Sequence, residues 1–553
     1  MRFLKLLLKK KSNATMFAFL FLVFPLYIFE SIPVYTDIRQ NDNFFLQETI
    51  KNAPKSATDL NSIIVKFGGD GTDRAYGATK DIFNNTYICG LTTSVNFPVT
   101  ANASQMNYGG GDWDGFVMKI SSQSQLIYSS YFGGNRLDNL GDIYFNSFNE
   151  LLIVGSSTSS DIPYLDSSFL EKKVNDNNFV LEMDFETMQV SNISFFGGSG
   201  FDNVHRSIMD SNGNILLIGD TDSKDLPTSK DSIQQDLKGK NDLFICNYSR
   251  ISKSFDYITY FGGSNTEGEP AIAVNADGLI GIIGYTQSTD VNLTSNAYQT
   301  QLSGGNDVLI SVLNVSARKI EFCTYFGGDG GDFGYGIAFS TDDELVVSGN
   351  TYSSNFPMKN AKDSTNNGEF DVFLSIFSAN LYGLKYSSYY GGNGSDQISG
   401  LKITKDNLII IYGSTTSEDF PTTESAIQET LSGENDGFIS VVDINGKIEF
   451  STFIGGKNQD DFWNLRICSE SNEIILPGSS NSNNFPRLNE VSSLDEGQEI
   501  DGILCIFSID ALIGGTIEKI GTSSVSSFPL IPIVLGALFM TILLLNKNRK
   551  IRN

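Results

Sequence analysis

A nine-residue segment, residues 324–332 (TYFGGDGGD), recurs in six further variants along this chain of 553 residues. The variants align on paired glycines, and the first glycine of each pair stands 64 or 65 residues after the last one, at Gly68, Gly133, Gly197, Gly262, Gly327, Gly391 and Gly455. A period so constant over seven copies indicates a repeat array, because one unit cannot bury its own apolar face and has to stack on its neighbours. The sequence therefore predicts a single array of seven units.

Each unit carries three further landmarks in a fixed order. The first is an acid five residues after the first glycine, at Asp73, Asp138, Asp202, Glu267, Asp332, Asp396 and Asp460. The second is a glycine followed by serine four residues later and by Asp or Asn six residues later, as in residues 349–357 (GNTYSSNFP). The third is a D-x-F/L-V/I sequence, at Asp114, Asp242, Asp307, Asp371, Asp436 and Asp501, with Asn177 replacing the acid in the second unit.

Short apolar segments rich in Ile, Val, Phe and Tyr lie between these landmarks, for example residues 345–347, 372–377 and 385–390. Their lengths suit strands, and Asn212-Gly213 and Asp277-Gly278 are hairpin turn signals between the first two strands of a unit. Four antiparallel strands repeated radially form the blades of a β-propeller. The predicted fold class is therefore all-β, a seven-bladed β-propeller over residues 61–510.

The two ends of the array are complementary. Residues 61–69 (NSIIVKFGG) supply a fourth strand that lacks a unit of its own, whereas the seventh unit stops after its third strand at residues 501–510. We expect these two segments to pair, so that the N-terminal strand closes the ring and no blade keeps an open edge.

Together, the FGG sequence with its acid, the GxTxSxDFP sequence and the D-x-F-V sequence resemble the repeats of the SBBP family of seven-bladed β-propellers. The resemblance covers about residues 61–510. It implies the propeller fold and an extracytoplasmic setting in prokaryotes, and it implies no particular biochemical activity.

The strand directions place the glycine turns and the long GxTxSxDFP loops on the same rim, together with most of the repeated polar residues. One interpretation is that each acid or amide accepts backbone N–H bonds inside its own blade and so holds a loop that has no ladder of its own. The other is calcium binding, which needs six to eight oxygen ligands. Unit five is the richest candidate, with Asp329, Asp332, Asn355, Glu369 and Asp371.

Both ends of the chain carry membrane-type segments. A basic start followed by apolar residues predicts that residues 1–29 are a secretory signal peptide or an uncleaved N-terminal anchor, and residues 30–60 are a polar arm. Behind the array, a linker at residues 511–527 precedes eighteen apolar residues, 528–545, and a basic tail, 546–553. This order predicts a transmembrane helix with a cytoplasmic tail, and it also resembles a prokaryotic sorting signal. In either case we expect the propeller on the extracytoplasmic side of the cell membrane.

Composition narrows the classes of function. The net charge of −26 leaves no basic footprint, which argues against nucleic acid as a partner. His205 is the only histidine, so a Ser-His-Asp arrangement has to use this residue, and histidine metal triads are excluded. The five cysteines lack metal-type spacing and mostly fall in apolar runs, which predicts buried free thiols. No catalytic residues are assigned, and calcium is the one cofactor considered.

Trp113 and Trp463 are the only tryptophans, and neither belongs to the repeat. They stand in the first and seventh units, on loops of the same predicted rim, so they form either a stacking platform for a sugar ring or hydrophobic loop packing. The chain is predicted to be a cell-surface, membrane-anchored module for binding, adhesion or structure, with a glycan or protein ligand at the rim. The alternative is an extracytoplasmic carbohydrate-active enzyme that uses rim carboxylates.

Overall fold

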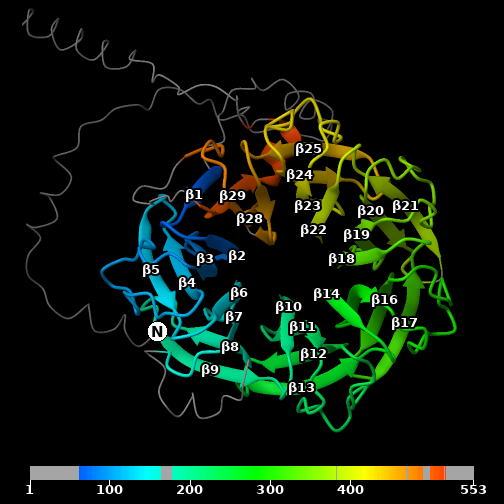
Figure 1. Ribbon diagram of the computed structural model, residues 1–553, viewed down its shortest axis with the longest axis horizontal. Helices are drawn as coiled ribbons and strands as arrows, with labels where there is room; N and C mark the ends of the chain where they lie inside the picture. The colour runs from blue at the N-terminus through cyan, green and yellow to red at the C-terminus, as the bar shows by residue number, and fades with distance from the viewer. Residues whose placement is uncertain are drawn as a thin grey trace, which may run out of the picture. The chain divides into compact units, whose positions relative to one another are not determined.

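The computed structural model describes residues 62–162, 177–381, 383–468, 471–489, 499–515 and 517. Within these residues the strands form seven antiparallel sheets, arranged as the blades of a β-propeller (Figure 1). The predicted all-β, seven-bladed fold is confirmed. Each acid that follows a glycine pair begins the innermost strand of a blade, and the next three strands follow in chain order towards the outside.

Six blades each contain four consecutive strands. The first three are β2 (Asp73–Lys80), β3 (Thr86–Thr92), β4 (Asp114–Ile120) and β5 (Leu126–Phe132); β6 (Asp138–Phe145), β7 (Leu151–Ser157), β8 (Asn177–Met183) and β9 (Val190–Phe196); and β10 (Asp202–Met209), β11 (Ile215–Thr221), β12 (Asp242–Ser249) and β13 (Ser254–Phe261). The next three are β14 (Glu267–Val274), β15 (Ile280–Thr286), β16 (Asp307–Asn314) and β17 (Lys319–Phe326); β18 (Asp332–Phe339), β19 (Leu345–Thr351), β20 (Asp371–Phe377) and β21 (Leu384–Tyr390); and β22 (Asp396–Ile403), β23 (Ile409–Thr415), β24 (Asp436–Val442) and β25 (Ile448–Ile454).

The last blade is assembled from both ends of the array. It contains β26 (Asp460–Phe462), β27 (Arg466–Cys468), β28 (Glu473–Ser480), β29 (Asp501–Ser508) and the N-terminal strand β1 (Ile63–Phe67). Strand β1 runs antiparallel to β29, with Ile63 opposite Ile506 and Phe67 opposite Gly502. The buried Lys66 ammonium lies 2.8 Å from a carboxylate oxygen of Asp501 in this blade. The N-terminal strand thus occupies the outer position that the seventh unit leaves open.

The core lies between neighbouring blades. All seven residues of β4, β20 and β24 are buried, because a middle strand is covered on both faces by adjacent sheets. Aromatic rings cross the junctions, as in the pair Phe132 and Phe179, whose centroids lie 5.5 Å apart. In β2 and β6, by contrast, the first half alternates buried and partly exposed residues. The partly exposed side chains of the inner strands line the centre of the propeller.

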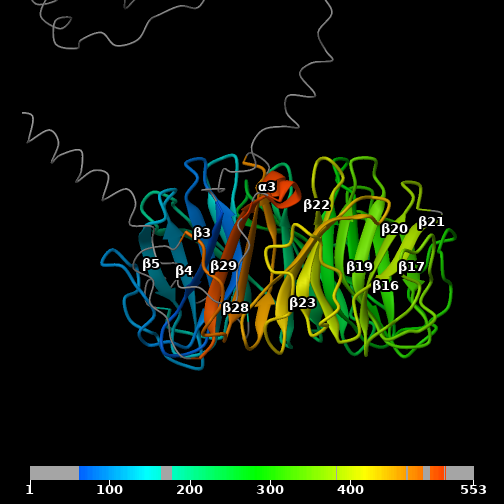
Figure 2. The same ribbon diagram turned by 90° about the horizontal axis from the view of Figure 1, so that it is seen from above.

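We distinguish the two faces of the propeller by the elements at their rims. The glycine face carries the starts of the inner strands and the paired glycines. The opposite face, here the helix face, carries the short helix α3 (Ile509–Gly514), which follows the far end of β29 (Figure 2). Ser508 caps this helix, since its hydroxyl accepts from the Ala511 N–H at 3.4 Å.

The predicted signal peptide, polar arm, transmembrane helix and basic tail all lie outside the described residues, as does most of the linker apart from residues 511–515 and 517. No helix within the described part of the chain is long and apolar enough to cross a membrane. Membrane anchoring therefore stays a prediction. Cys89, Cys246, Cys323 and Cys505 are buried free thiols and Cys468 is a partly buried one, so this prediction from the sequence is confirmed.

Candidate ligand site at the centre of the glycine face

The repeated acids of the glycine face hold the loops of their own blades. In the fifth blade, Oδ2 of Asp332 accepts the Gly328 N–H at 2.7 Å and the Ser353 hydroxyl at 2.8 Å. Asn355 Oδ1 accepts the Asp329 N–H at 2.9 Å. Equivalent bonds recur in other blades, for example from the Gly392 N–H to Asp396 at 2.7 Å. These contacts are those expected if the repeat conserves loop geometry within each unit.

Two carboxylates from adjacent blades also face each other at most blade junctions. The first glycine of the pair fits between them, since a Cβ built on Gly133 would lie 2.5 Å from Asp114 Oδ1 and 2.9 Å from Asp138 Oδ2. Burial raises the pKa of Asp114 to about 7, and the charge of Asp138 raises it further. Burial likewise raises the pKa of Asp436 to about 7, with a contribution from Asp460. These acids are fully buried at the blade junctions.

The five calcium candidates do not converge on one point. Asp332 approaches Gly327 beside Asp307, whereas Asp371 approaches Gly391 beside Asp396, at the next junction. In the sheet, Thr351 pairs with Asp332 on one side and with Asp371 on the other, which puts two strand spacings, about 10 Å, between the two acids. No group of three or more His, Cys, Asp or Glu side chains in the described ranges is arranged to hold a metal ion. Calcium binding stays a prediction, and unfolding temperatures measured with calcium and with chelator test it.

A β-bulge recurs in the inner strands and points one residue of each into the centre. In β2 the register shifts between Ala75 and Gly77, so that Tyr76 has no partner on β3. The same shift places His205 of β10 at the bulge, between Val204 and Arg206. A bulge re-aims the extra side chain. In the last blade the strand breaks here, between β26 and β27, because Pro477 on the partner strand has no N–H to donate. Trp463 occupies this break, and its backbone N–H donates to the Pro477 carbonyl at 3.1 Å.

Two cavities open at this level. One of about 320 Å³ is lined by residues that include Tyr76, His205 and Trp463, and one of about 510 Å³ by residues that include Arg74 and Trp113. Tyr76, Asn139, Ser156 and Asn203 line both. We refer to Arg74, Tyr76, Asn139, Asn203, His205 and Trp463 as the mouth site. The structure thus brings the two tryptophans to adjoining cavities, with Tyr76 between them.

The mouth site combines an aromatic surface with polar atoms that lack protein partners. The Tyr76 ring packs edge-on against Trp463 with centroids 6.0 Å apart, and the Arg74 guanidinium lies 5.8 Å from the Trp463 centroid. The indole N–H donates to the Ser479 hydroxyl at 3.1 Å, which fixes the ring. Arg74 Nε and Asn139 Oδ1 are buried and have no hydrogen-bond partner among the described residues. Buried polar atoms are almost always paired, so these two are expected to meet a ligand or water.

His205 is held by acids and amides. Its Nε2 contacts Asp220 closely and lies 3.0 Å from the Asn203 amide, while Asn241 donates to the other Asp220 oxygen at 2.6 Å. The imidazole retains a quarter of its surface and lines the 320 Å³ cavity. This arrangement is a hydrogen-bonded network at the edge of the cavity.

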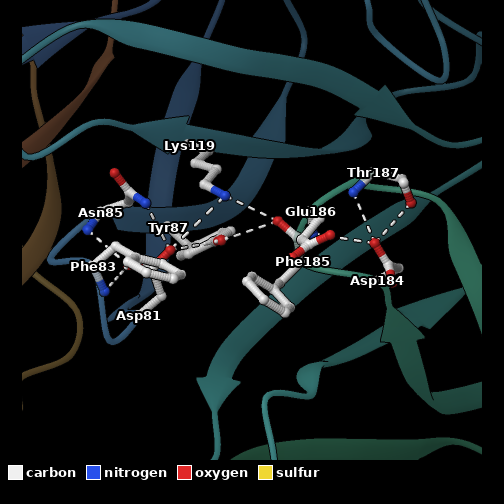
Figure 3. Close-up of polar contacts among 9 residues, drawn as sticks. All are labelled: Asp81, Phe83, Asn85, Tyr87, Lys119, Asp184, Phe185, Glu186 and Thr187. Carbon is white, nitrogen blue, oxygen red and sulfur yellow. Dashed lines mark hydrogen bonds and ion pairs between the residues drawn. The ribbon is translucent and has the colours of Figure 1, made fainter. Parts of the chain in front are cut away.

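The helix face carries a different kind of polar cluster, where the first two blades meet (Figure 3). Lys119 donates to the Phe185 carbonyl at 2.9 Å and lies 3.8 Å from Asp81, and the Tyr87 hydroxyl donates to the same Asp81 at 3.1 Å. Asp81 also accepts the Phe83 and Asn85 backbone N–H groups, at 2.9 Å each. Lys119 and Asp81 both have protein partners, so we interpret this cluster as a set of contacts that stabilises the junction between the first two blades.

Of the mouth residues, the sequence analysis singled out only Trp463 and His205. Arg74, Asn139 and His205 follow the repeated acids by one or three residues, at positions whose identity varies from blade to blade. Variation at a fixed register position, next to a fixed bulge, is the signal that identifies them.

Comparison with known proteins assigns no activity to this chain. No family model matches the chain, and no curated protein sequence matches it, so the SBBP resemblance stays a prediction. Similar solved structures include hydrazine synthase from Kuenenia stuttgartiensis, at 9% identity and a TM-score of 0.40 over 80% of this chain and 99% of that one. A PL25 polysaccharide lyase, an ulvan lyase, is 9% identical with a TM-score of 0.43, over 75% of this chain and 91% of that one. Sqt1 from Chaetomium thermophilum is 11% identical with a TM-score of 0.39, over 81% of this chain and 100% of that one. The class established by the chain's own structure is a seven-bladed β-propeller.

Proposed function

We propose that this propeller is an extracytoplasmic binding module whose mouth site holds a saccharide. The observation that carries the proposal is the juxtaposition of the Trp463 and Tyr76 rings with the unpaired Arg74 Nε and Asn139 Oδ1. Sugar rings stack on aromatic faces, and their hydroxyl groups both donate and accept hydrogen bonds. A site with one free donor and one free acceptor beside an indole suits such a ligand.

Binding is favoured over catalysis by the state of the rim acids. Carboxylate-dependent glycoside cleavage needs two acids that flank an open groove. The paired acids of the glycine face are buried at the blade junctions and accept hydrogen bonds from their own loops. Export and membrane anchoring, inferred from the two terminal segments, belong to the same proposal, as does a ring closed by β1.

The two tryptophans provide the test, because all of the protein's indole fluorescence arises from Trp113 and Trp463. Titration of the full-length chain with neutral and acidic saccharides should give a saturable change in emission for at least one class. Trp463→Phe should weaken binding about 3- to 10-fold, the magnitude of one aromatic contact. Phe83→Leu, an exposed aromatic on the helix face, is the matched control and should bind as wild type. A flat titration with every saccharide, or unchanged binding by W463F, would refute the proposal.

A further inference from the structure

Below the mouth site, the centre of the propeller contains an excess of positive charge. Three cationic side chains from three blades meet there, namely Arg206 of β10, Lys402 of β22 and Arg466 of β27, together with one carboxylate, Asp142 of β6. All four follow the bulge or the break of an inner strand and lie outside the repeat pattern. In a chain of net charge −26, a cationic cluster at the axis requires an explanation.

The carboxylate is fully engaged by other groups. Asp142 Oδ1 accepts from Arg466 at 2.9 Å and from the Ile143 N–H at 2.9 Å. Its Oδ2 accepts the Tyr144 hydroxyl at 2.7 Å and the Ser207 hydroxyl at 3.2 Å. Asp142 therefore balances Arg466 and leaves the other two cations without a counter-charge.

Those two cations have only neutral partners, or none. Arg206 donates to the carbonyls of His205 and Ser399, each at 3.0 Å, which leaves three of its five N–H donors unused. The Lys402 ammonium has no hydrogen-bond or ion-pair partner within the part of the chain that the structure describes. The contrast with Lys119 is direct, because that ammonium has both a carbonyl and a carboxylate (Figure 3). Both side chains are only partly buried, so their unused N–H groups are accessible to a ligand from the centre of the propeller.

Arg206 and Lys402 line a cavity of about 20 Å³, enough for one or two waters. It shares Asp142, Arg206, Ser207 and Asn464 with the 320 Å³ cavity of the mouth site, so the two cavities adjoin. An acidic group that extends from the 320 Å³ cavity into the small one would meet both cations.

We propose that Lys402 and Arg206, backed by Arg466, form an oxyanion-binding site at the centre of the propeller, for a carboxylate, sulfate or phosphate group. Two sources supply this chemistry, a free inorganic ion or the acidic group of a saccharide seated at the mouth site. The second source rests on the proposed function and the first does not.

Five titratable or charged groups face Lys402, and among the six side chains Lys402 is the one whose pKa lies closest to neutral pH. These five groups are Asp142, Arg206, Arg466, and the phenols of Tyr335 on β18 and Tyr412 on β23. Burial, followed by the charges of Arg466 and Arg206, lowers the Lys402 pKa to about 8. Burial raises the pKa of Tyr412 to about 12, and that of Tyr335 also rises, so both phenols stay neutral. Oxyanion binding should therefore weaken as the pH rises above about 8.

Equilibrium dialysis of the full-length chain against radiolabelled sulfate, at ionic strength fixed with sodium chloride, is the first arm of the test. The second arm compares glucuronate with glucose by tryptophan fluorescence. Lys402→Met should weaken binding of sulfate or glucuronate about 10- to 100-fold, as expected for the loss of a charge-assisted hydrogen bond. Lys405→Met removes an exposed charge three residues away and is the matched control, with binding unchanged. Without anion, K402M should unfold at or above the wild-type temperature, because an unbalanced charge has been removed.

The outcomes separate the sources and the two proposals. Sulfate binding that depends on Lys402 and is unaffected by Trp463→Phe identifies a free-ion site. Binding of glucuronate alone, sensitive to both substitutions, identifies the acidic group of a saccharide. Absence of saturable binding by either probe, or equal binding by K402M and wild type, overturns the inference. Neutral saccharides that bind through Trp463 with no preference for glucuronate, together with no saturable sulfate binding, overturn it as well and leave the proposed function intact.

Discussion

Neutralising one acid of a junction pair should make the propeller more stable at alkaline pH. Asp436 is fully buried, and its Oδ2 accepts the Ser432 N–H at 2.8 Å and the Gln428 amide at 2.6 Å. Burial raises its pKa from 3.8 to about 7, with a further contribution from Asp460. Asp436→Asn keeps the shape and an acceptor oxygen while it removes the titration.

The direction follows from proton linkage. Between pH 4 and pH 7 the unfolded chain has lost the Asp436 proton and the folded chain retains it. The free energy of unfolding therefore falls by about 1.4 kcal/mol per pH unit for this one group. The full shift corresponds to about 4 kcal/mol, and we expect about 2–4 kcal/mol after allowance for water penetration and one altered hydrogen bond. The stabilisation is complete below pH 4 and is lost as the pH rises through 7.

Thermal unfolding followed by circular dichroism from pH 5 to pH 8 measures this effect. The entropy of unfolding of roughly 450 residues makes 1 kcal/mol equivalent to about 1 °C, so D436N should melt about 2–4 °C above wild type at pH 8. At pH 5 the difference should be smaller by about 2–3 °C, because the unfolded chain has by then lost its proton over little more than one pH unit. Glu434→Gln removes an exposed charge two residues away and should leave the pH dependence unchanged. Parallel pH profiles for D436N and wild type would show that the pair does not retain a proton.

Three further substitutions test the packing. Gly133→Ala should destabilise the fold by about 2–3 kcal/mol, because its Cβ would overlap the paired carboxylates. Gly305→Ala is the control and should be neutral, because its Cβ would meet no atom within 4 Å. Equal unfolding midpoints for the two variants would contradict the predicted overlap. Tyr131→Phe should cost about 1–3 kcal/mol, because the hydroxyl donates to the Ser94 carbonyl at 2.8 Å and accepts the Phe97 N–H at 3.0 Å, and the exposed Tyr298 is the control for the same change in urea unfolding. Lys66→Met should lower the free energy of unfolding by about 3–5 kcal/mol, because it leaves the buried Asp501 without its cation. Adding Asp501→Asn should restore much of this stability, as measured by calorimetry. A double variant no more stable than Lys66→Met alone would show that the ion pair is not the cause.

The repeat made the architecture predictable, because seven copies report the same local requirements. The second glycine of each pair, its acid and the serine of the long loop form one hydrogen-bonded set, as in Gly328, Asp332 and Ser353. A requirement shared by every blade appears at every period of the sequence. The acids of the fifth unit suggested a calcium site because several of them recur on one predicted rim. The structure instead places Asp332 and Asp371 at two different junctions.

The buried tyrosines of the outer strands also recur with the repeat, although the sequence analysis assigned them no role. Tyr131, Tyr260, Tyr325 and Tyr389 all donate to a carbonyl in the long loop of their blade. The sixth unit has Phe453 at this register position. A recurrent tyrosine in a buried strand indicates a partner for its hydroxyl, so the repeat alone could have assigned this role.

By itself the sequence determined the number of blades, the order of strands within them and the residues that hold their loops, because each of these depends on contacts within one unit or between neighbours. Only the tertiary structure decided what meets at the centre. Arg206, Lys402 and Arg466 stand on β10, β22 and β27, in units separated by as many as 260 residues, and no period relates them. They approach one another because the blades are arranged radially and the inner strands bulge toward the same axis, which is a geometric consequence of the whole propeller that no single repeat contains.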